Sequence, residues 1–216
     1  MEHLYCISGF GADERMFAKL KVPNYQLHHI QWLVPLKKES LKNYAQRMAD
    51  QIRHKSPVLL GLSFGGIMSI EIAKLLETKA VIIISSVKQT REMPSWMRLA
   101  GALKLHRIFP LRSSWLTRPI QNYNLGLSST EEKALVYSYR KHVDQSYVNW
   151  AINTILTWNN VWKPKNLYHI HGTGDRIFPA SRVKANTMIL KGGHLMILNR
   201  AAEINSALNQ YLQNMP

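Results

Sequence analysis

The residues from Pro57 to Gly66 place an apolar strand directly before the pattern Gly-x-Ser-x-Gly and an apolar helix directly after it. This order of residues is typical of a sharp turn from strand to helix with a serine at its apex. We expect Ser63 to take a strained backbone conformation, and Gly61 and Gly65 to be small because neighbouring backbone approaches them closely. Such a turn holds one hydroxyl clear of the sheet, so Ser63 is predicted to be a nucleophile.

The motif by itself is weakly specific, and the flanking segments give the stronger support for this prediction. Val58, Leu59 and Leu60 form a short apolar run, as in a strand buried on both faces. The segment after the motif is a largely apolar helix that must pack against a sheet, and its N-terminus directs backbone N–H groups toward the serine. The alternative is a glycine-rich turn with an incidental serine.

A serine hydroxyl needs a base within hydrogen-bond reach, and the base needs an orienting group. A predicted strand over residues 167–171 ends in a loop that carries Asp175. A second predicted strand, over 187–190, precedes Gly192, Gly193 and His194. The chain order of serine, aspartate and histidine is the one found when all three lie at the carboxyl ends of parallel strands.

At this point the chain resembles the α/β-hydrolase superfamily, from about Leu4 to Leu212, with a weaker stretch between Val87 and Pro164. Four ordered motifs carry the resemblance: Ser8-Gly9-Phe10-Gly11, Gly61-x-Ser63-x-Gly65-Gly66, Gly174-Asp175-x-x-x-Pro179 and Gly192-Gly193-His194. The resemblance implies that Ser63 is the nucleophile, that His194 is the general base and then the general acid, and that Asp175 orients the histidine.

Other acids and histidines compete weakly for these roles. Beyond Asp144 the chain has only Asp175 and Glu203, and Glu203 falls on the polar flank of the predicted closing helix. Asp175 follows a strand, where functional residues collect, although an aspartate there also suits a plain turn. The histidines of the predicted strands are interpreted as core or surface groups: His28, His29, His169 and His171.

Acyl transfer also requires donors that stabilise the developing oxyanion. The backbone N–H of Phe64, the residue after the serine, is the first candidate, and the second lies in the loop after the first strand. By resemblance, that second donor is the N–H of Phe10. The superfamily often has His-Gly where this chain has Ser8-Gly9, a change that keeps the main-chain donor. Gly9 and Phe10 are also predicted to contact the substrate.

Alternating strands and helices predict an α/β fold, doubly wound, with a mostly parallel sheet of about six strands and a helical lid insertion. The predicted strands cover 4–8, 25–32, 57–62, 79–85, 167–171 and 187–190. The predicted helices of the core cover 13–20, 40–54, 64–77, 180–185 and 195–213, with Ser40 as an N-cap. The core domain is predicted to span 1–86 and 165–216, and the lid insertion 87–164.

The insertion is predicted from helical periodicity over 96–105 and 130–158. It holds five of the six tryptophans: Trp96, Trp115, Trp150, Trp158 and Trp162. An insertion at this point resembles the lid of many α/β-hydrolases, which excludes water and shapes the substrate pocket. Trp115 and Trp150 are predicted to contact the substrate; the alternative is that the aromatic side chains only pack the insertion onto the core.

The formal net charge of the 216-residue chain is +15, and the insertion holds eleven Lys or Arg against four Asp or Glu. A solvated basic surface explains such an excess most simply. Alternatives are attraction of an anionic substrate and loose attachment to anionic lipids. Nucleic acid is not an expected partner, because no recognition motif accompanies the charge.

Several absences complete the prediction. The N-terminus lacks the pattern of a signal peptide, and no apolar stretch reaches the ~18 residues of a transmembrane helix. Cys6 is the single cysteine, which favours the cytoplasm. His169 and His171 lack a third ligand, so no metal is expected, and no glycine loop suggests a phosphate cofactor. The sequence does not predict the oligomeric state.

The predicted function is that of a serine hydrolase that cleaves a small or medium carboxylic ester or thioester through an acyl-enzyme. One alternative keeps the fold and the three residues but uses them for C–C bond hydrolysis, lyase or perhydrolase chemistry. Another alternative is a ligand-binding or membrane-associated protein with little turnover, which the basic insertion motivates.

Overall fold

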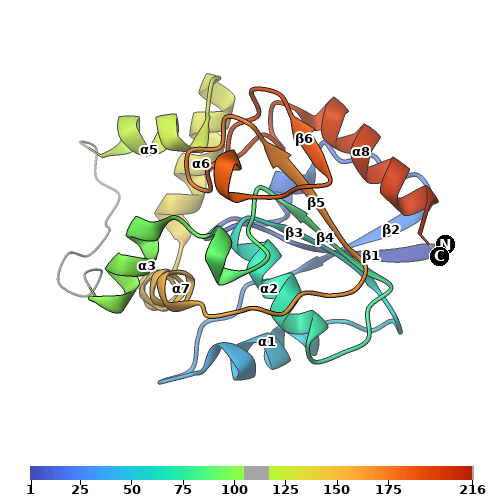
Figure 1. Ribbon diagram of the computed structural model, residues 1–216, viewed down its shortest axis with the longest axis horizontal. Coiled ribbons are helices and arrows are strands. Elements are labelled where there is room, and N and C mark those ends of the chain that lie inside the picture. Colours follow the sequence, from blue (N-terminus) through green and yellow to red (C-terminus); the bar gives the residue numbers. More distant parts are fainter. Residues whose placement is uncertain (105–116, 216) are drawn as a thin grey trace.

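The computed structural model describes residues 1–104 and 117–215 and has one six-stranded sheet (Figure 1). The strand order is β2-β1-β3-β4-β5-β6, and every pair is parallel. The strands are β1 (Glu2–Ile7), β2 (Tyr25–Ile30), β3 (Val58–Leu62), β4 (Ala80–Ile84), β5 (Leu167–Gly172) and β6 (Thr187–Ile189). Since all strands run the same way, their carboxyl ends meet at one edge, where loops can assemble a site.

Helices cover both faces of the sheet. One core packs β-strand side chains against the 3₁₀ helix η1 (Glu14–Phe17) and the closing helix α8 (Ala201–Gln213). The other packs the opposite face against α1 (Leu41–Ala49) and α2 (Phe64–Ala73). In Figure 1, α8 lies above the sheet, and α1 and α2 lie below it. The doubly wound α/β fold predicted from the sequence is therefore confirmed.

The central strands β3 and β4, and helix α2 between them, are apolar because other elements pack on both of their sides. Every residue of β3 and of β4 is buried, and so are the first seven residues of α2. At the surface, helix α1 begins with the predicted cap, because the Ser40 hydroxyl accepts the Asn43 N–H at 3.2 Å. The local sequence therefore indicates both the polar residue that caps a helix and the apolar residues through which a helix packs.

Between β4 and β5 the chain forms helices and, within the described residues, no strand. They are α3 (Ser95–Ala102), α5 (Arg118–Leu125), α6 (Thr130–His142) and α7 (Gln145–Thr157), with the 3₁₀ turn η2 (Thr90–Glu92) before them. Helix α6 begins with a capping box between Ser129 and Glu132, and α7 with Asp144 as its cap.

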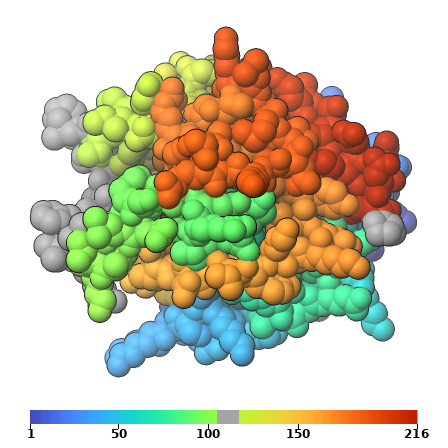
Figure 2. Space-filling view, in the orientation of Figure 1, coloured from blue at the N-terminus to red at the C-terminus, as the bar shows by residue number. Residues whose placement is uncertain are grey.

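This helical insertion is divided between the two cores. Val136 and Tyr139 of α6 pack with the α8 face, whereas Tyr147 and Ala151 of α7 pack with the α1 and α2 face. Figure 2 shows α3, in green, against the orange C-terminal half of the chain, and the Arg182 guanidinium donates to Ser95 Oγ at 3.0 Å there. The insertion therefore packs on both faces of the sheet, near the carboxyl ends of its strands (Figure 1).

Several element boundaries differ from the sequence prediction. The closing helix begins at Ala201, not at 195, because Leu195 and Leu198 are buried in turns whose first N–H bonds to Leu125. Strand β2 ends at Ile30, and α1, α2 and η1 are shorter than predicted. Helix α5 was not predicted at all. The helical periodicity predicted over 130–158 belongs to two helices, which separate at Val143 and Asp144.

No helix among the described residues is long and apolar enough to cross a membrane. Cys6 lies in β1, is buried, and has no disulfide partner. Burial raises the pKa of its thiol, so the side chain acts as a packing group.

Candidate active site

Ser63 sits between β3 and α2 in a backbone conformation that L-residues rarely adopt, with φ 53° and ψ −116°. The flanking glycines allow the turn. A Cβ atom on Gly61 would lie 2.3 Å from the Gly65 carbonyl oxygen, and one on Gly65 would lie 2.1 Å from the carbonyl oxygen of Ile7. The predicted strain and the predicted close backbone approaches are both confirmed.

Hydrogen bonds on each side hold the strained residue in place. The Ser63 N–H donates to the Ile84 carbonyl at 2.9 Å, and the Ser63 carbonyl accepts from the Ser86 hydroxyl at 2.7 Å and the Gly66 N–H at 2.9 Å. The end of strand β4 and the residues after it therefore hold the backbone of Ser63 in place. Ser86 is a supporting residue that the sequence analysis missed, because only the strand pairing places it there.

The structure brings Ser63, His194 and Asp175 into one hydrogen-bonded chain. The Ser63 hydroxyl oxygen is 2.8 Å from His194 Nε2, and His194 Nδ1 is 2.9 Å from Asp175 Oδ2. A carboxylate only accepts, so Nδ1 carries the proton and Nε2 is free to accept from the serine. A histidine in this tautomer can take the proton of the serine hydroxyl.

Asp175 is fixed in orientation and in charge. Its other oxygen, Oδ1, accepts the N–H groups of Ile177 at 2.8 Å and Phe178 at 2.9 Å. Burial by itself would raise the pKa of this carboxyl, but the neighbouring His194 and these N–H donors outweigh burial and lower it. The carboxylate is therefore ionised at neutral pH, as a group that orients an imidazole must be.

A buried pair of histidines lies behind Asp175. The Phe178 carbonyl accepts from His171 Nε2 at 2.8 Å, so His171 Nδ1 is unprotonated and accepts from His169 Nε2 at 3.2 Å. Burial lowers the pKa of both imidazoles, that of His169 strongly, so both are neutral. His171 thus ties β5 to the loop that holds Asp175, a role that its place in a strand did not suggest.

The loop that carries His194 depends on glycine and on the insertion. A Cβ atom on Gly193 would lie 2.9 Å from the Cα of Gly126, which ends α5 in a left-handed conformation with φ 72°. Next to this contact, the Leu195 N–H donates to the Leu125 carbonyl at 2.9 Å. The insertion therefore helps to set the position of the imidazole.

The two predicted oxyanion donors lie in the residue after Ser63 and in the loop after β1. Phe64 is the first residue of α2, and neither its N–H nor that of Phe10 donates to an acceptor among the described residues. The loop that holds Phe10 is close, since a Cβ atom on Gly9 would lie 3.7 Å from the Cβ of Ser63. N–H groups without an acceptor in the protein, in loops close to a serine, suit the stabilisation of an oxyanion.

Ser8 supports this loop directly. Its hydroxyl donates to the Ala12 carbonyl at 2.6 Å and accepts from the Trp32 indole N–H at 3.0 Å. The Phe10 ring lies parallel to that of Tyr147 in α7, with centroids 6.0 Å apart. Trp32 and Tyr147 are long-range supports that no local pattern could have indicated.

Of the two tryptophans predicted to contact substrate, the structure describes only Trp150. Trp115 lies outside the described residues. The Trp150 indole N–H donates to the Glu39 carbonyl at 3.2 Å, and its ring packs on Tyr44 at 4.0 Å and on Phe64 at 6.2 Å between centroids. Trp150 therefore joins α7 to α1 and to the residue after Ser63, and its contact with substrate stays a prediction.

A surface hollow of about 470 Å³ lies away from these residues, beside β6 and the start of α8. Leu190, Arg200 and Glu203 line it, and Ser63, Asp175 and His194 do not. It is not a candidate for the substrate site of this serine.

No protein-family model matches the chain, and no curated protein matches it significantly. Solved structures do match. A thermophilic esterase from Thermogutta terrifontis is 14% identical with a TM-score of 0.71, covering 100% of this chain and 90% of its own. The hydrolase olei00960 from Oleispira antarctica is 12% identical with a TM-score of 0.69, covering 99% and 92%. A bromoperoxidase from Bacillus anthracis is 14% identical with a TM-score of 0.69, covering 99% and 92%.

These similarities extend over nearly the whole chain. Together with the all-parallel sheet and the strand–serine–helix turn, they define the fold: the chain has the α/β-hydrolase fold. The fold that the four sequence motifs predicted is thus confirmed, and the chemistry must be argued from the site.

Proposed function

We propose that the protein hydrolyses a carboxylic ester or thioester through an acyl-enzyme on Ser63. The observation that carries this proposal is the continuous chain of hydrogen bonds from Ser63 Oγ through His194 to the ionised Asp175, at 2.8 Å and 2.9 Å. The similar structures of an esterase and a hydrolase support the same class of reaction.

The proposed reaction has two halves. Ser63 Oγ attacks the carbonyl carbon of the substrate while its proton passes to His194 Nε2, and His194 then gives that proton to the departing alcohol or thiol. Water attacks the resulting acyl-enzyme, with His194 again taking and returning the proton, and the carboxylic acid leaves. Asp175 keeps the imidazole in the required tautomer throughout and stabilises its charged form.

The N–H groups of Phe64 and Phe10 are proposed to bind the oxyanion in both halves. Loss of one such donor typically costs about 3–4 kcal/mol of transition-state stabilisation. Gly9 is proposed to leave room for the acyl group, since its nearest neighbours include the Cβ of Ser63. This loop would therefore contact the substrate through its backbone and the Phe10 ring.

The helical insertion, residues 87–164, is proposed to act as a lid. The core domain that it would cover consists of residues 1–86 and 165–216. The contacts of the insertion with both the Phe10 loop and the His194 loop support this role. Trp115 and Trp150 are proposed substrate contacts. A solvated surface explains the basic excess of the insertion most simply, and attraction of an anionic substrate is the alternative. A single buried cysteine suits the cytoplasm.

A panel of short and medium p-nitrophenyl esters and acyl thioesters tests the proposal. We expect turnover by the wild type, a loss of several orders of magnitude in Ser63→Ala, and full activity in Ser206→Ala, an exposed serine of α8. Equal activity in Ser63→Ala would overturn it. If the folded wild type turned over none of the substrates, the alternative of a ligand-binding or membrane-associated protein would be favoured. Anionic lipid is a partner to test in that case.

The similar structure of a bromoperoxidase supports a second candidate, in which hydrogen peroxide replaces water in the second half-reaction. The same three residues would serve, so the two candidates differ only in what attacks the acyl-enzyme. Measuring peracid formation from an ester and hydrogen peroxide, beside hydrolysis of the same ester, distinguishes them. A β-diketone in the panel covers C–C bond hydrolysis in the same way.

A further inference from the structure

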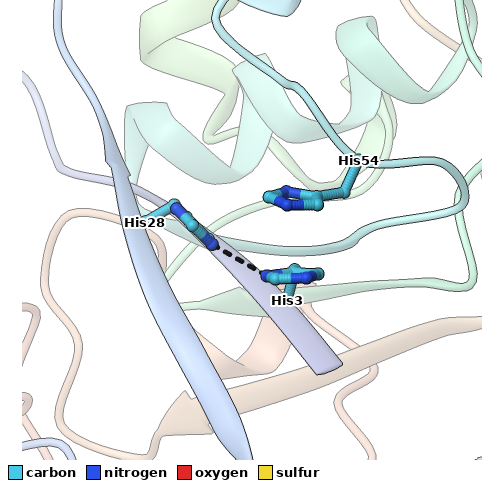
Figure 3. Close-up of side chains that lie close together, drawn as sticks. All are labelled: His3, His28 and His54. Carbon is cyan, nitrogen blue, oxygen red and sulfur yellow. Dashed lines mark hydrogen bonds between the residues drawn. The ribbon is translucent and has the colours of Figure 1, made fainter. Parts of the chain in front are cut away.

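Three histidines gather at the end of the sheet opposite Ser63. His3 lies at the start of β1, His28 lies in β2, and His54 lies in the segment that follows α1. Figure 3 shows the His54 ring above that of His3, with His28 beside them. All three side chains are half-buried, so the cluster faces solvent on one side and protein on the other.

The ring nitrogens of the cluster are close enough to share one ion. His3 Nδ1 is 2.9 Å from His28 Nε2, and one ring nitrogen of each histidine lies within 4.8 Å of one on each of the others. The His3 and His54 rings stack with centroids 3.4 Å apart. Two imidazole nitrogens at 2.9 Å must hold a proton between them, in a position that a cation can take instead.

Protein groups outside the cluster orient His54. The Tyr5 hydroxyl oxygen is 2.6 Å from His54 Nδ1 and accepts the Arg53 N–H at 3.0 Å. When Nδ1–H donates to this oxygen, Nε2 keeps its lone pair free for a metal ion. Histidines that bind metals usually donate their second N–H to such a fixed acceptor.

The donor atoms that the cluster offers are imidazole nitrogens. The side chains that make up the cluster include no carboxylate. Neutral nitrogen donors without oxygen donors suit zinc, copper or nickel, and suit magnesium and calcium poorly.

We propose that His3, His28 and His54 bind one divalent transition-metal ion, of the kind that zinc represents. Nitrogens about 2.0–2.1 Å from a tetrahedral zinc ion lie roughly 3.4 Å apart, between the 2.9 Å contact and the 4.8 Å limit found here. Because a metal lies in the plane of each ring, His54 must tilt out of its stack with His3 on binding. Water fills the fourth position.

This site is separate from the proposed active site. His3 lies near the start of β1 and Ser8 directly follows its end, five residues later, a span of about 17 Å at the rise of a parallel strand. An ion there would join β1, the edge strand β2 and the segment after α1. Its effect would therefore be on the stability of the fold, and the hydrolysis of esters does not depend on it.

Calorimetric titration of the metal-free full chain with zinc chloride tests the proposal. We expect one ion per chain with a Kd in the micromolar range, and a rise in Tm of about 5 °C at a hundredfold excess over Kd. His54→Gln and His3→Gln should each weaken binding at least tenfold. His29→Gln is the matched control, because it is the neighbour of His28 on β2 and lies outside the cluster.

Cobalt(II) provides a second readout that identifies the ligands. Visible bands of nitrogen-bound cobalt should form with the wild type and with His194→Gln, and should be lost with His3→Gln. Circular dichroism of each metal-free variant confirms that it is folded. No binding by the wild type, or binding by His54→Gln and His3→Gln as tight as that of the wild type, would overturn the proposal and leave the cluster as a packed proton-sharing trio. Ester hydrolysis plays no part in the outcome.

Discussion

At Ser63 a φ of 53° is kept because the surrounding structure determines it from several sides. Conformations of this kind cost about 1–3 kcal/mol and persist where other contacts oppose relaxation. Here the contacts are the bonds to Ile84 and Ser86 and the close approach of Gly65 to the backbone of Ile7. The strain directs the hydroxyl to His194, so the conformation is part of how the proposed nucleophile is placed.

The role of Asp175 predicts a specific failure in Asp175→Asn. Asparagine keeps an oxygen for the N–H groups of Ile177 and Phe178, but its NH₂ group would face His194 Nδ1 and force the other tautomer. We expect kcat for an ester to fall by roughly 10³–10⁴-fold with little change in the circular dichroism spectrum. Asp144→Asn, which keeps a good helix cap, is the control. A loss smaller than tenfold in Asp175→Asn would contradict the assignment.

His171 is expected to act by positioning the loop of Asp175. His171→Phe removes the donor to the Phe178 carbonyl, and a displacement of the loop by about 1 Å should lower kcat ten- to hundredfold with KM nearly unchanged. His171→Gln, which can still donate, should keep more activity than His171→Phe. If the two variants lose the same activity, or if only Tm changes, the residue merely fills space. His142→Gln, on the surface of α6, serves as the control.

Among the elements, α7 determines how the insertion meets the core. Trp150→Ala removes a ring that packs on Tyr44 and Phe64, and should destabilise the protein by about 2–4 kcal/mol. For a chain of this size that corresponds to a fall in Tm of roughly 5–10 °C. Trp162→Ala, at a side chain with 42% of its surface exposed, should change Tm little. Equal shifts in both variants would show that Trp150 does not join the two parts.

The elements of the core were predictable because their patterns are local. The run around Ser63, the apolar strands and the cap at Ser40 each identify themselves within a few residues. The boundary of α8 was not predictable, since Leu195 is held in a turn by Leu125, a residue seventy positions earlier. Helix α5 was also missed, because its eight residues include no buried side chain and so give no apolar stripe.

The same distinction applies to the site. The order of Ser63, Asp175 and His194 and the glycines beside them indicated which residues meet at the carboxyl edge of the sheet. Their supports, such as Trp32 at Ser8 and His171 at Phe178, depend on which strands become neighbours. A single sequence does not specify those pairings residue by residue.

At the scale of the whole molecule, buried neutral histidines predict sensitivity to acid. His169 and His171 have a pKa below that of an unfolded chain, so unfolding takes up protons once the pH falls below about 6.5. Their contribution to stability is full above that pH and is lost as the pH falls toward the folded pKa values. Each proton taken up lowers the free energy of unfolding by about 1.4 kcal/mol per pH unit.

Melting curves between pH 8 and pH 5 measure this effect. We expect Tm to fall steadily below about pH 6.5, and to fall less steeply in His169→Gln than in the wild type. His142→Gln, an exposed histidine, should keep the slope of the wild type. A Tm independent of pH over this range would contradict the buried, neutral state of the pair.

The most direct test of the account is to ask whether Ser63 is activated in the folded protein. A fluorophosphonate probe reacts with an activated serine whatever the natural substrate is, and mass spectrometry locates the label. We predict stoichiometric label on Ser63 in the wild type and in Ser206→Ala, with none on Ser63→Ala and slow labelling of Asp175→Asn. A folded wild type that takes no label, or takes it at another serine, would contradict the proposed nucleophile.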